Sequence, residues 1–351
     1  MQHQDGNALR LIHSVAVGLL LTLVAVSAAA QDTWDNVPRI VAIGDLHGDY
    51  EQYVRLLQMN GLIDKRLRWT GGDTHLVQLG DVPDRGPDSL KIIRHLMKLE
   101  REARRDGGYV HALIGNHEAM NIGGDLRYVS EGEYAALVTR NSARTQHVYV
   151  ERVYDHLLAQ QPELAANKDE TMAKLMHQFP EGYVEHRRLW QPGGEIARWV
   201  ASHNAVIRIN GILFCHGGVD PHTPLRPIDD INSEIRAILS SDRAFGPNYA
   251  NDETSPLWYR GLATHDEQTE EPALQQMLDY YGAQRIVIGH TPTSSGKITA
   301  RFGGKVIMAD VGASAYYGSH LASLVVENGE LYSRTPDGVA PLFPVPVAAG
   351  K

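Results

Sequence analysis

The eleven residues from Arg39 to Asp49, RIVAIGDLHGD, contain the first strand and polar turn of a pattern that recurs along the chain. Residues 39–43 are rich in β-branched and apolar side chains, which predicts a short buried strand. Gly44-Asp45 ends this strand, and residues 50–60 then carry apolar side chains at helical spacing. The stretch therefore predicts a strand, a polar turn and a helix in succession.

Two similar units follow along the chain. Strands are predicted at 76–79 and 109–114, with a helix over 89–105 between them, and the strands end in Gly80-Asp81 and Gly115-Asn116. This β-α-β-α-β order is typical of parallel strands joined by right-handed crossovers. Polar residues just beyond the carboxyl ends of such strands converge on one crevice.

The later part of the chain mixes hairpins and further strands. Asn210-Gly211 and Asn328-Gly329 are strong hairpin signals, and apolar segments flank both. Residues 130–202 are polar, charged and helical in pattern, which predicts an inserted helical cap. Together these patterns predict an α/β (α+β) fold. The remaining strands are expected at 205–209, 212–215, 285–288, 306–309, 324–326 and 330–332.

Both ends of the chain are expected to lie outside the folded domain, which spans 37–335. Arg10 precedes an apolar run from 11 to 26, and small residues follow. This is the layout of a secretory signal peptide over 1–30, and it predicts a periplasmic or secreted protein with no membrane span after cleavage. An uncleaved anchor is the alternative, because roughly 18 to 20 apolar residues can cross a bilayer. The proline-containing residues 336–351 are expected to form a loose tail.

Composition narrows the possible functions. The 351 residues include 17 His but a single Cys, which excludes a disulfide framework and Cys-rich zinc modules. Imidazole binds metals and moves protons near neutral pH. The formal net charge of -9 argues against a general nucleic-acid binder, since such binding depends on Lys and Arg. A site for an anionic substrate must therefore be positive locally.

Five short motifs at the ends of predicted strands carry the candidate chemistry. An Asp and a His two residues apart can face one ion from a turn, and glycine lets the backbone approach closely. A mixed set of carboxylate, imidazole and amide ligands suits Mn, Fe or Zn better than Ca or Cu. The motifs are GDLHGD (44–49), GDVPDRG (80–86), GNHE (115–118), HGG (216–218) and GHT (289–291).

In this order the motifs resemble the signature of calcineurin-like metallophosphoesterases of the phosphoprotein phosphatase type. The run GNHEAMN (115–121), followed by GDLRYV (124–129), is similar to the Shewanella-like, bacterial-type branch. The resemblance extends over residues 40–332. It implies a β-sandwich flanked by helices, two metals at the strand ends, and an enzyme that hydrolyses phosphomonoesters.

The resemblance also assigns metal ligands. Asp81 is expected to bridge two ions, which keeps them roughly 3.5 Å apart so that they polarise the phosphoryl oxygens and activate a bridging water. Manganese is the expected metal, with iron and zinc as alternatives. The resemblance assigns the first ion to Asp45, His47 and Asp81, and the second to Asp81, Asn116, His216 and His290.

Further residues are assigned to the reaction itself. The family implies that His117 protonates the leaving oxygen and that Asp84 holds its other ring nitrogen. Arg85 offers a planar fork suited to phosphate. A second arginine is implied, for which Arg260 is the best match and Arg127 a weaker one. The bridging hydroxide is then expected to attack phosphorus directly, without a covalent phosphoenzyme.

Three functions remain open on the sequence alone. The first is a phosphoprotein phosphatase that acts on phosphotyrosine, phosphoserine or phosphothreonine. The second keeps the mechanism but acts on a small phosphoester, such as a dinucleoside polyphosphate. The third is a non-catalytic metal-binding protein. His117, Asp84 and Arg85 argue against the third, because metal storage needs neither an acid nor a phosphate clamp.

Overall fold

The computed structural model describes residues 31–343. The predicted signal peptide over 1–30 and the last part of the predicted tail, 344–351, lie outside the described residues. Within 31–343, no helix is both long and apolar enough to cross a lipid bilayer.

Two six-stranded mixed sheets form the centre of the structure. The strand order is β12-β11-β10-β2-β3-β4 in one sheet and β1-β5-β6-β7-β9-β8 in the other. The first sheet consists of β2 (Arg39–Ile43), β3 (His75–Gln78), β4 (Tyr109–Ala112), β10 (Ser323–Glu327), β11 (Glu330–Thr335) and β12 (Gly338–Pro341). The second consists of β1 (Thr33–Trp34), β5 (Val206–Ile209), β6 (Ile212–Cys215), β7 (Arg285–Ile288), β8 (Thr299–Arg301) and β9 (Val306–Met308).

Strand directions confirm the predicted units. β2, β3 and β4 run parallel, as the repeated strand–turn–helix order predicts. Both predicted hairpins are present, since β5 pairs antiparallel with β6 and β10 with β11. The tightest hairpin turns need positive φ at both central residues, and Asn210 (φ 50) and Gly211 (φ 72) supply it.

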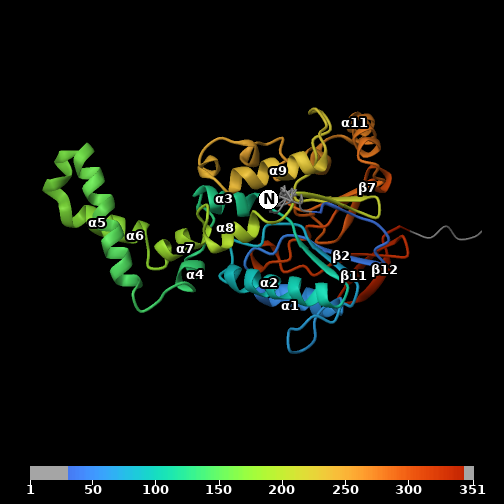
Figure 1. Ribbon diagram of the computed structural model, residues 1–351, viewed down its shortest axis with the longest axis horizontal. Helices are drawn as coiled ribbons and strands as arrows, with labels where there is room; N and C mark the ends of the chain where they lie inside the picture. Colours follow the sequence, from blue (N-terminus) through green and yellow to red (C-terminus); the bar gives the residue numbers. More distant parts are fainter. Residues whose placement is uncertain (1–30, 344–351) are drawn as a thin grey trace, which may run out of the picture.

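Helices cover both outer sides of the sheet pair (Figure 1). α1 (Tyr50–Met59) lies against α2 (Ser89–Arg105), and α2 packs on β4. On the other side, α9 (Ile228–Leu239) packs on β5. Buried side chains of both sheets, such as Ile40 and Leu213, belong to one continuous core. The predicted α/β sandwich flanked by helices is therefore confirmed.

Three further helices are α3 (Asn116–Gly123), α10 (Gly261–Thr264) and α11 (Glu267–Tyr280).

The segment predicted as a helical cap contains only helices and connecting turns between 131 and 200. They are α4 (Glu131–Ala135), α5 (Ser142–Gln160), a 3-10 helix (Pro162–Asn167), α6 (Lys168–Gln178), α7 (Tyr183–Trp190) and α8 (Glu195–Val200). α5 and α6 extend away from the two sheets as an arm (Figure 1). The arm has a small apolar cluster of its own, formed by Val150, Tyr154 and Leu175. Its role as a cap stays a prediction.

The start of the C-terminal tail differs from the prediction. β12 pairs antiparallel with β11, with Val339 opposite Arg334. The prediction of a loose segment over 336–351 is therefore wrong for residues 338–341. All four residues of β12 are exposed. Backbone hydrogen bonds to β11 hold this edge strand, and its side chains show none of the apolar periodicity by which a sequence pattern detects a strand.

Candidate active site at the strand ends

Five loops bring predicted site residues to one place. Asp45, Asp81 and Asn116 follow the parallel strands β2, β3 and β4 of one sheet. His216 and His290 follow β6 and β7, which are parallel in the other sheet. All five side chains are buried. Loops at the carboxyl ends of parallel strands share one edge of a sheet, so the two sheets together build a common site.

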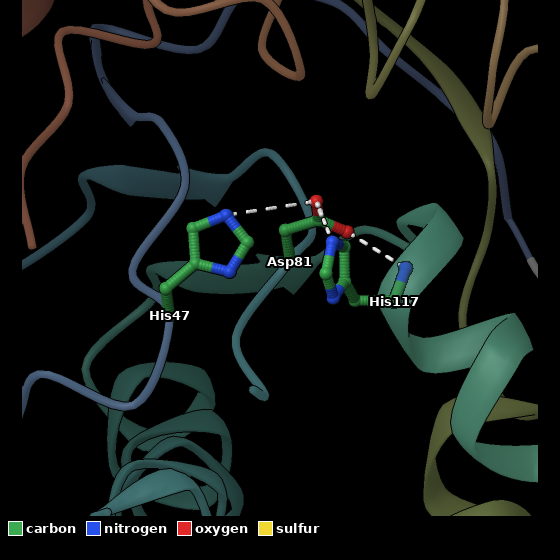
Figure 2. A group of neighbouring side chains, drawn as sticks. All are labelled: His47, Asp81 and His117. Atoms are coloured by element: carbon green, nitrogen blue, oxygen red, sulfur yellow. Dashed lines mark hydrogen bonds and ion pairs between the residues drawn. The ribbon is translucent and has the colours of Figure 1, made fainter. Parts of the chain in front are cut away.

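Asp81 lies at the centre of this site, between the rings of His47 and His117 (Figure 2). Its Oδ2 atom is 3.9 Å from His47 Nε2 and 3.8 Å from His117 Nε2. His216 Nε2 lies 3.2 Å from the same oxygen. The backbone N–H of His117 donates to the other oxygen, Oδ1, at 2.9 Å. One carboxylate therefore faces imidazoles from segments that follow three different strands, which is the position expected of a residue shared by two ions.

The residues assigned to the second ion also converge. His216 Nε2 is 2.9 Å from Asn116 Oδ1 and 3.0 Å from His290 Nδ1. The carbonyl oxygen of Leu79 lies 2.8 Å from His216 Nδ1, so we assign the proton to Nδ1 and the lone pair to Nε2. His290 Nε2 is buried and has no hydrogen-bond partner within 31–343. His216 Nε2, Asn116 Oδ1 and the ring nitrogens of His290 are atoms of the kind that bind a divalent cation.

His47 is oriented in the same way. The carbonyl oxygen of Pro83 lies 3.2 Å from His47 Nδ1, which leaves Nε2 facing Asp81. Burial lowers the pKa of His47 to about 4, and burial together with His216 lowers the pKa of His290. Both rings are therefore neutral at neutral pH, as metal binding requires.

The carboxylates are crowded. Burial, together with the neighbouring charges of Asp310 and Asp81, raises the pKa of Asp45. Burial opposes ionisation of Asp81 as well, but the imidazoles of His216 and His117 hold its pKa below the usual range. A bound cation would offset the repulsion between these acids, because positive charge favours the ionised form of each. The charge distribution therefore also fits divalent metals.

His117 is held by a network behind the ring. Its Nδ1 is hydrogen-bonded to the buried Asp84 carboxylate. The Asn121 amide donates to the other Asp84 oxygen at 2.9 Å and to the His117 carbonyl oxygen at 2.9 Å. Burial alone would lower the pKa of His117, but Asp81 and Asp84 outweigh it and raise the pKa to about 9. The ring is therefore protonated at neutral pH.

Two residues of this network have no assigned role in the sequence prediction. Asn121 lies four residues after His117 on α3, so helical spacing is the signal that places it there. Glu118 accepts backbone N–H bonds from Gly115 at 2.8 Å, Asp81 at 3.0 Å and Val82 at 2.8 Å. Its signal is an acid in the first turn of a helix that begins at a predicted strand end. Glu118 thus ties the loop after β3 to the start of α3.

Asp310 is a third residue that the prediction omits. It follows β9 and is buried close to Asp45. Its Oδ1 accepts from the backbone N–H of Gly312 at 2.9 Å, and its Oδ2 has no partner among the described residues. The strand at 306–309 is predicted, so the rule that polar residues after parallel strands converge also applies to Asp310.

A cavity of about 110 Å³ opens onto most of the predicted site residues. Asp84 and His216 do not line it, because they are fully buried behind His117 and Asp81. Arg127 is absent from the lining and pairs with Asp125 instead. The lining consists of Asp45, His47, Asp81, Arg85, Asn116, His117, Tyr128, Trp258, Arg260, His290, Pro292 and Tyr317.

Both predicted phosphate-binding arginines therefore reach the cavity. Arg260 Nη1 donates to the His290 carbonyl oxygen at 2.8 Å and to Thr291 Oγ1 at 2.9 Å, which fixes the guanidinium beside the last predicted ligand. A larger cavity of about 440 Å³ lies beside β1 and β4, but no predicted site residue lines it. The larger of these two cavities is therefore not the predicted site.

The loops of the site adopt unusual backbone conformations. Positive φ angles occur at His47 (44°), Asp81 (56°), Asp84 (75°), Arg85 (69°) and His290 (63°). L-residues rarely adopt this region, and such strain concentrates at functional sites where the surroundings enforce it. The sheets and the hydrogen bonds of the loops supply that enforcement here.

Together, the helix-flanked sheets and the buried carboxylate, imidazole and amide cluster define a metal-dependent phosphatase. The chain belongs to the calcineurin-like phosphoesterase family, whose model matches residues 38–294. It is 32% identical over 299 residues to Shewanella-like protein phosphatase 2 of Arabidopsis thaliana, which covers 81% of this chain and 73% of that protein. The predicted resemblance to this group is therefore confirmed.

Two other comparisons bear on function. The crystal structure of a cold-active protein-tyrosine phosphatase from a psychrophilic Shewanella species matches with a TM-score of 0.67 and 28% identity, covering 89% of this chain and 82% of that one. A symmetrical bis(5'-nucleosyl)-tetraphosphatase of Legionella pneumophila is 24% identical over 254 residues, which is 71% of this chain and 67% of that protein.

Gly115→Ala is expected to weaken metal binding roughly 10- to 100-fold, the range for changes that disturb a ligand from behind. A Cβ atom at this position would lie 2.3 Å from Asp81 Oδ1 and 2.5 Å from the Asp81 nitrogen, so the shared carboxylate must move. Calorimetric titration of metal-free protein with Mn²⁺ measures the change. Gly193→Ala is the control: no atom lies within 4 Å of the new methyl group, and its positive φ (82°) makes alanine more strained there than at Gly115 (φ −100°), so a loss of binding in Gly115→Ala alone reports the contact with Asp81. Equal affinity in both variants would contradict the expectation.

Proposed function

We propose that this phosphatase is an exported protein phosphatase that hydrolyses phosphomonoesters of tyrosine, serine or threonine side chains. The observation that carries the proposal is the placement of His117 and two arginines, Arg85 and Arg260, around one small cavity. A phosphate dianion needs the arginines, and an alkoxide or phenoxide leaving group needs the proton. A protein that only stores metal needs neither.

Two divalent ions are proposed as cofactors, with manganese as the first choice and iron or zinc as alternatives. Asp45, His47 and Asp81 would hold one ion. Asp81, Asn116, His216 and His290 would hold the other. When bound, the ions supply Lewis-acid stabilisation of the charge on the phosphoryl group. The convergence of buried imidazoles on Asp81 supports this ligand set.

The protein side chains bind the phosphoryl group and supply the proton. Arg85 and Arg260 contact its non-bridging oxygens through their planar forks. His117 holds a proton on the ring and gives it to the leaving oxygen as the bond to phosphorus breaks. Asp84 keeps the ring oriented and favours its charged form. This role requires positioning and charge rather than a covalent intermediate.

The size of the cavity favours a protein substrate. Its volume of about 110 Å³ is small beside the roughly 300–1,000 Å³ of pockets that enclose whole small molecules. It therefore encloses the reacting phosphoryl group, while the rest of the substrate stays outside. The similar proteins from Arabidopsis and Shewanella are a protein phosphatase and a protein-tyrosine phosphatase, which agrees with this proposal.

The second candidate is hydrolysis of a small phosphoester such as a dinucleoside polyphosphate. It is supported by the likeness to the Legionella tetraphosphatase, at lower identity over a shorter alignment.

Export is proposed from the N-terminal pattern alone, with cleavage after Ala30.

A substrate panel tests the proposed activity. Metal-free protein reloaded with Mn²⁺ is assayed with a phosphotyrosine peptide, a phosphoserine peptide and diadenosine tetraphosphate. The expected result is a kcat/KM at least about tenfold higher for one of the peptides, a difference of roughly 1.4 kcal/mol in transition-state stabilisation. His117→Asn should lower kcat by roughly 10²- to 10⁴-fold without loss of metal. Rapid pyrophosphate-bond cleavage with inert phosphopeptides would support the second candidate, and unchanged turnover in His117→Asn would refute the acid role.

Export is tested on the mature protein. If the chain is expressed in full in a Gram-negative host, the processed protein should lie in the periplasmic fraction, and mass spectrometry should find Gln31 at its N-terminus. A full-length chain that stays with the membrane fraction would favour the uncleaved anchor instead.

A further inference from the structure

The side chain of Arg85 is enclosed by two aromatic rings at the mouth of the cavity. Its guanidinium carbon lies 3.8 Å from the centre of the Tyr128 ring and 4.7 Å from the centre of the Tyr316 ring. Arg85 Nη1 also donates to the Tyr316 hydroxyl at 3.3 Å, and the Arg85 backbone N–H donates to the Tyr128 carbonyl oxygen at 3.0 Å. Arginine stacks well on aromatic faces while its edge remains free for hydrogen bonds.

One donor of this guanidinium is unused. Arg85 Nε is buried and has no hydrogen-bond partner among residues 31–343. The two rings therefore restrict the side chain while Arg85 still lines the cavity in which an anion would bind. A flexible arginine loses rotamer entropy when it is immobilised, and prior stacking reduces that loss on binding.

The two tyrosines differ in what else they touch. The Tyr128 ring lies 5.1 Å from the His117 ring at an interplanar angle of 34°, whereas the ring contacts of Tyr316 are with Arg85 and Tyr317. Tyr316 is 61% exposed, and Tyr128 is half-buried and lines the cavity. Tyr128 therefore contacts both the proposed phosphate-binding arginine and the proposed proton donor, whereas Tyr316 contacts only the arginine of these two.

We propose that Tyr128 is a positioning residue that fixes Arg85 and His117 relative to each other, and that Tyr316 completes the outer face of Arg85 only. This inference rests on the proposed phosphatase function. Tyr128 acts through its ring, so phenylalanine at this position preserves the role. Phosphate binding depends on both rings, and proton donation depends on Tyr128.

The proposal predicts separate kinetic effects for the two tyrosines. Tyr128→Ala and Tyr316→Ala should each raise the inhibition constant for inorganic phosphate, by about tenfold and about threefold, because stacking on arginine is worth roughly 0.5–2 kcal/mol. Only Tyr128→Ala should also lower kcat more for an alkyl phosphate than for p-nitrophenyl phosphate. The reason is that the alkoxide needs a proton from His117, whereas the nitrophenolate leaves without one.

The experiment measures kcat and KM for phosphoserine peptide and p-nitrophenyl phosphate, together with competitive inhibition by inorganic phosphate, on the Mn²⁺-loaded chain. Tyr128→Phe should lie within about twofold of the wild type in every parameter. Tyr109→Ala is the matched control. Arg104 lies 4.9 Å from the Tyr109 ring centre and donates to its hydroxyl at 3.1 Å, and neither residue lines the catalytic cavity.

Each outcome decides the proposal. Equal leaving-group dependence in Tyr128→Ala and wild type would overturn the link to His117, and an unchanged phosphate inhibition constant in Tyr128→Ala would overturn the link to Arg85. Similar losses in Tyr109→Ala would show a general effect on stability and would also overturn it. If the wild type hydrolyses neither substrate, the proposed function fails, and calorimetric binding of inorganic phosphate to Tyr128→Ala and Tyr128→Phe still tests the Arg85 contact. Equal affinity in those two variants would then refute it.

Discussion

The burial of the Asp81 carboxylate among three imidazoles is the constraint on which the rest of the site depends. An ionised group removed from water costs several kcal/mol unless nearby groups compensate it, and His47, His117 and His216 approach Asp81 from segments that follow three different strands. Each segment must therefore hold its ring at a fixed distance from one oxygen. The parallel strands β2 and β4 in one sheet and β6 in the other determine where those segments start, so the two-sheet fold places all three rings around one carboxylate.

Side chains behind the site keep the loops in their strained conformations. Glu118 accepts three backbone N–H groups and joins the loop after β3 to the start of α3. Asn121 donates to Asp84, and Asp84 is hydrogen-bonded to His117, so these polar contacts and the ring of Tyr128 together hold the His117 imidazole. Positive φ angles at Asp81 and Asp84 persist because these bonds outweigh the local cost. A small change at Glu118, Asn121 or Asp84 therefore alters the geometry of the residues that face the cavity.

The sequence predicts much of the architecture and the residues that face the cavity, because both follow from short-range patterns. Parallel strands ended by Gly-Asp or Gly-Asn place Asp45, Asp81 and Asn116 together by topology alone. The supporting residues Glu118, Asn121 and Tyr128 are harder to predict, since their contacts depend on the direction of α3 and of the loop after it. The strand at residues 338–341 is not predictable from the sequence for another reason. An exposed edge strand is held by backbone hydrogen bonds, so its side chains need not form an apolar pattern.

Anomalous diffraction from crystals of the Mn²⁺-loaded protein tests the central claim most directly, because it locates each ion independently of activity. Two manganese peaks are expected, one on each side of the Asp81 carboxylate, with His47 beside one and His216 and His290 beside the other. A single peak, or a peak that Asp81 does not contact, would contradict the account of Asp81 as the shared residue around which both sheets assemble the site.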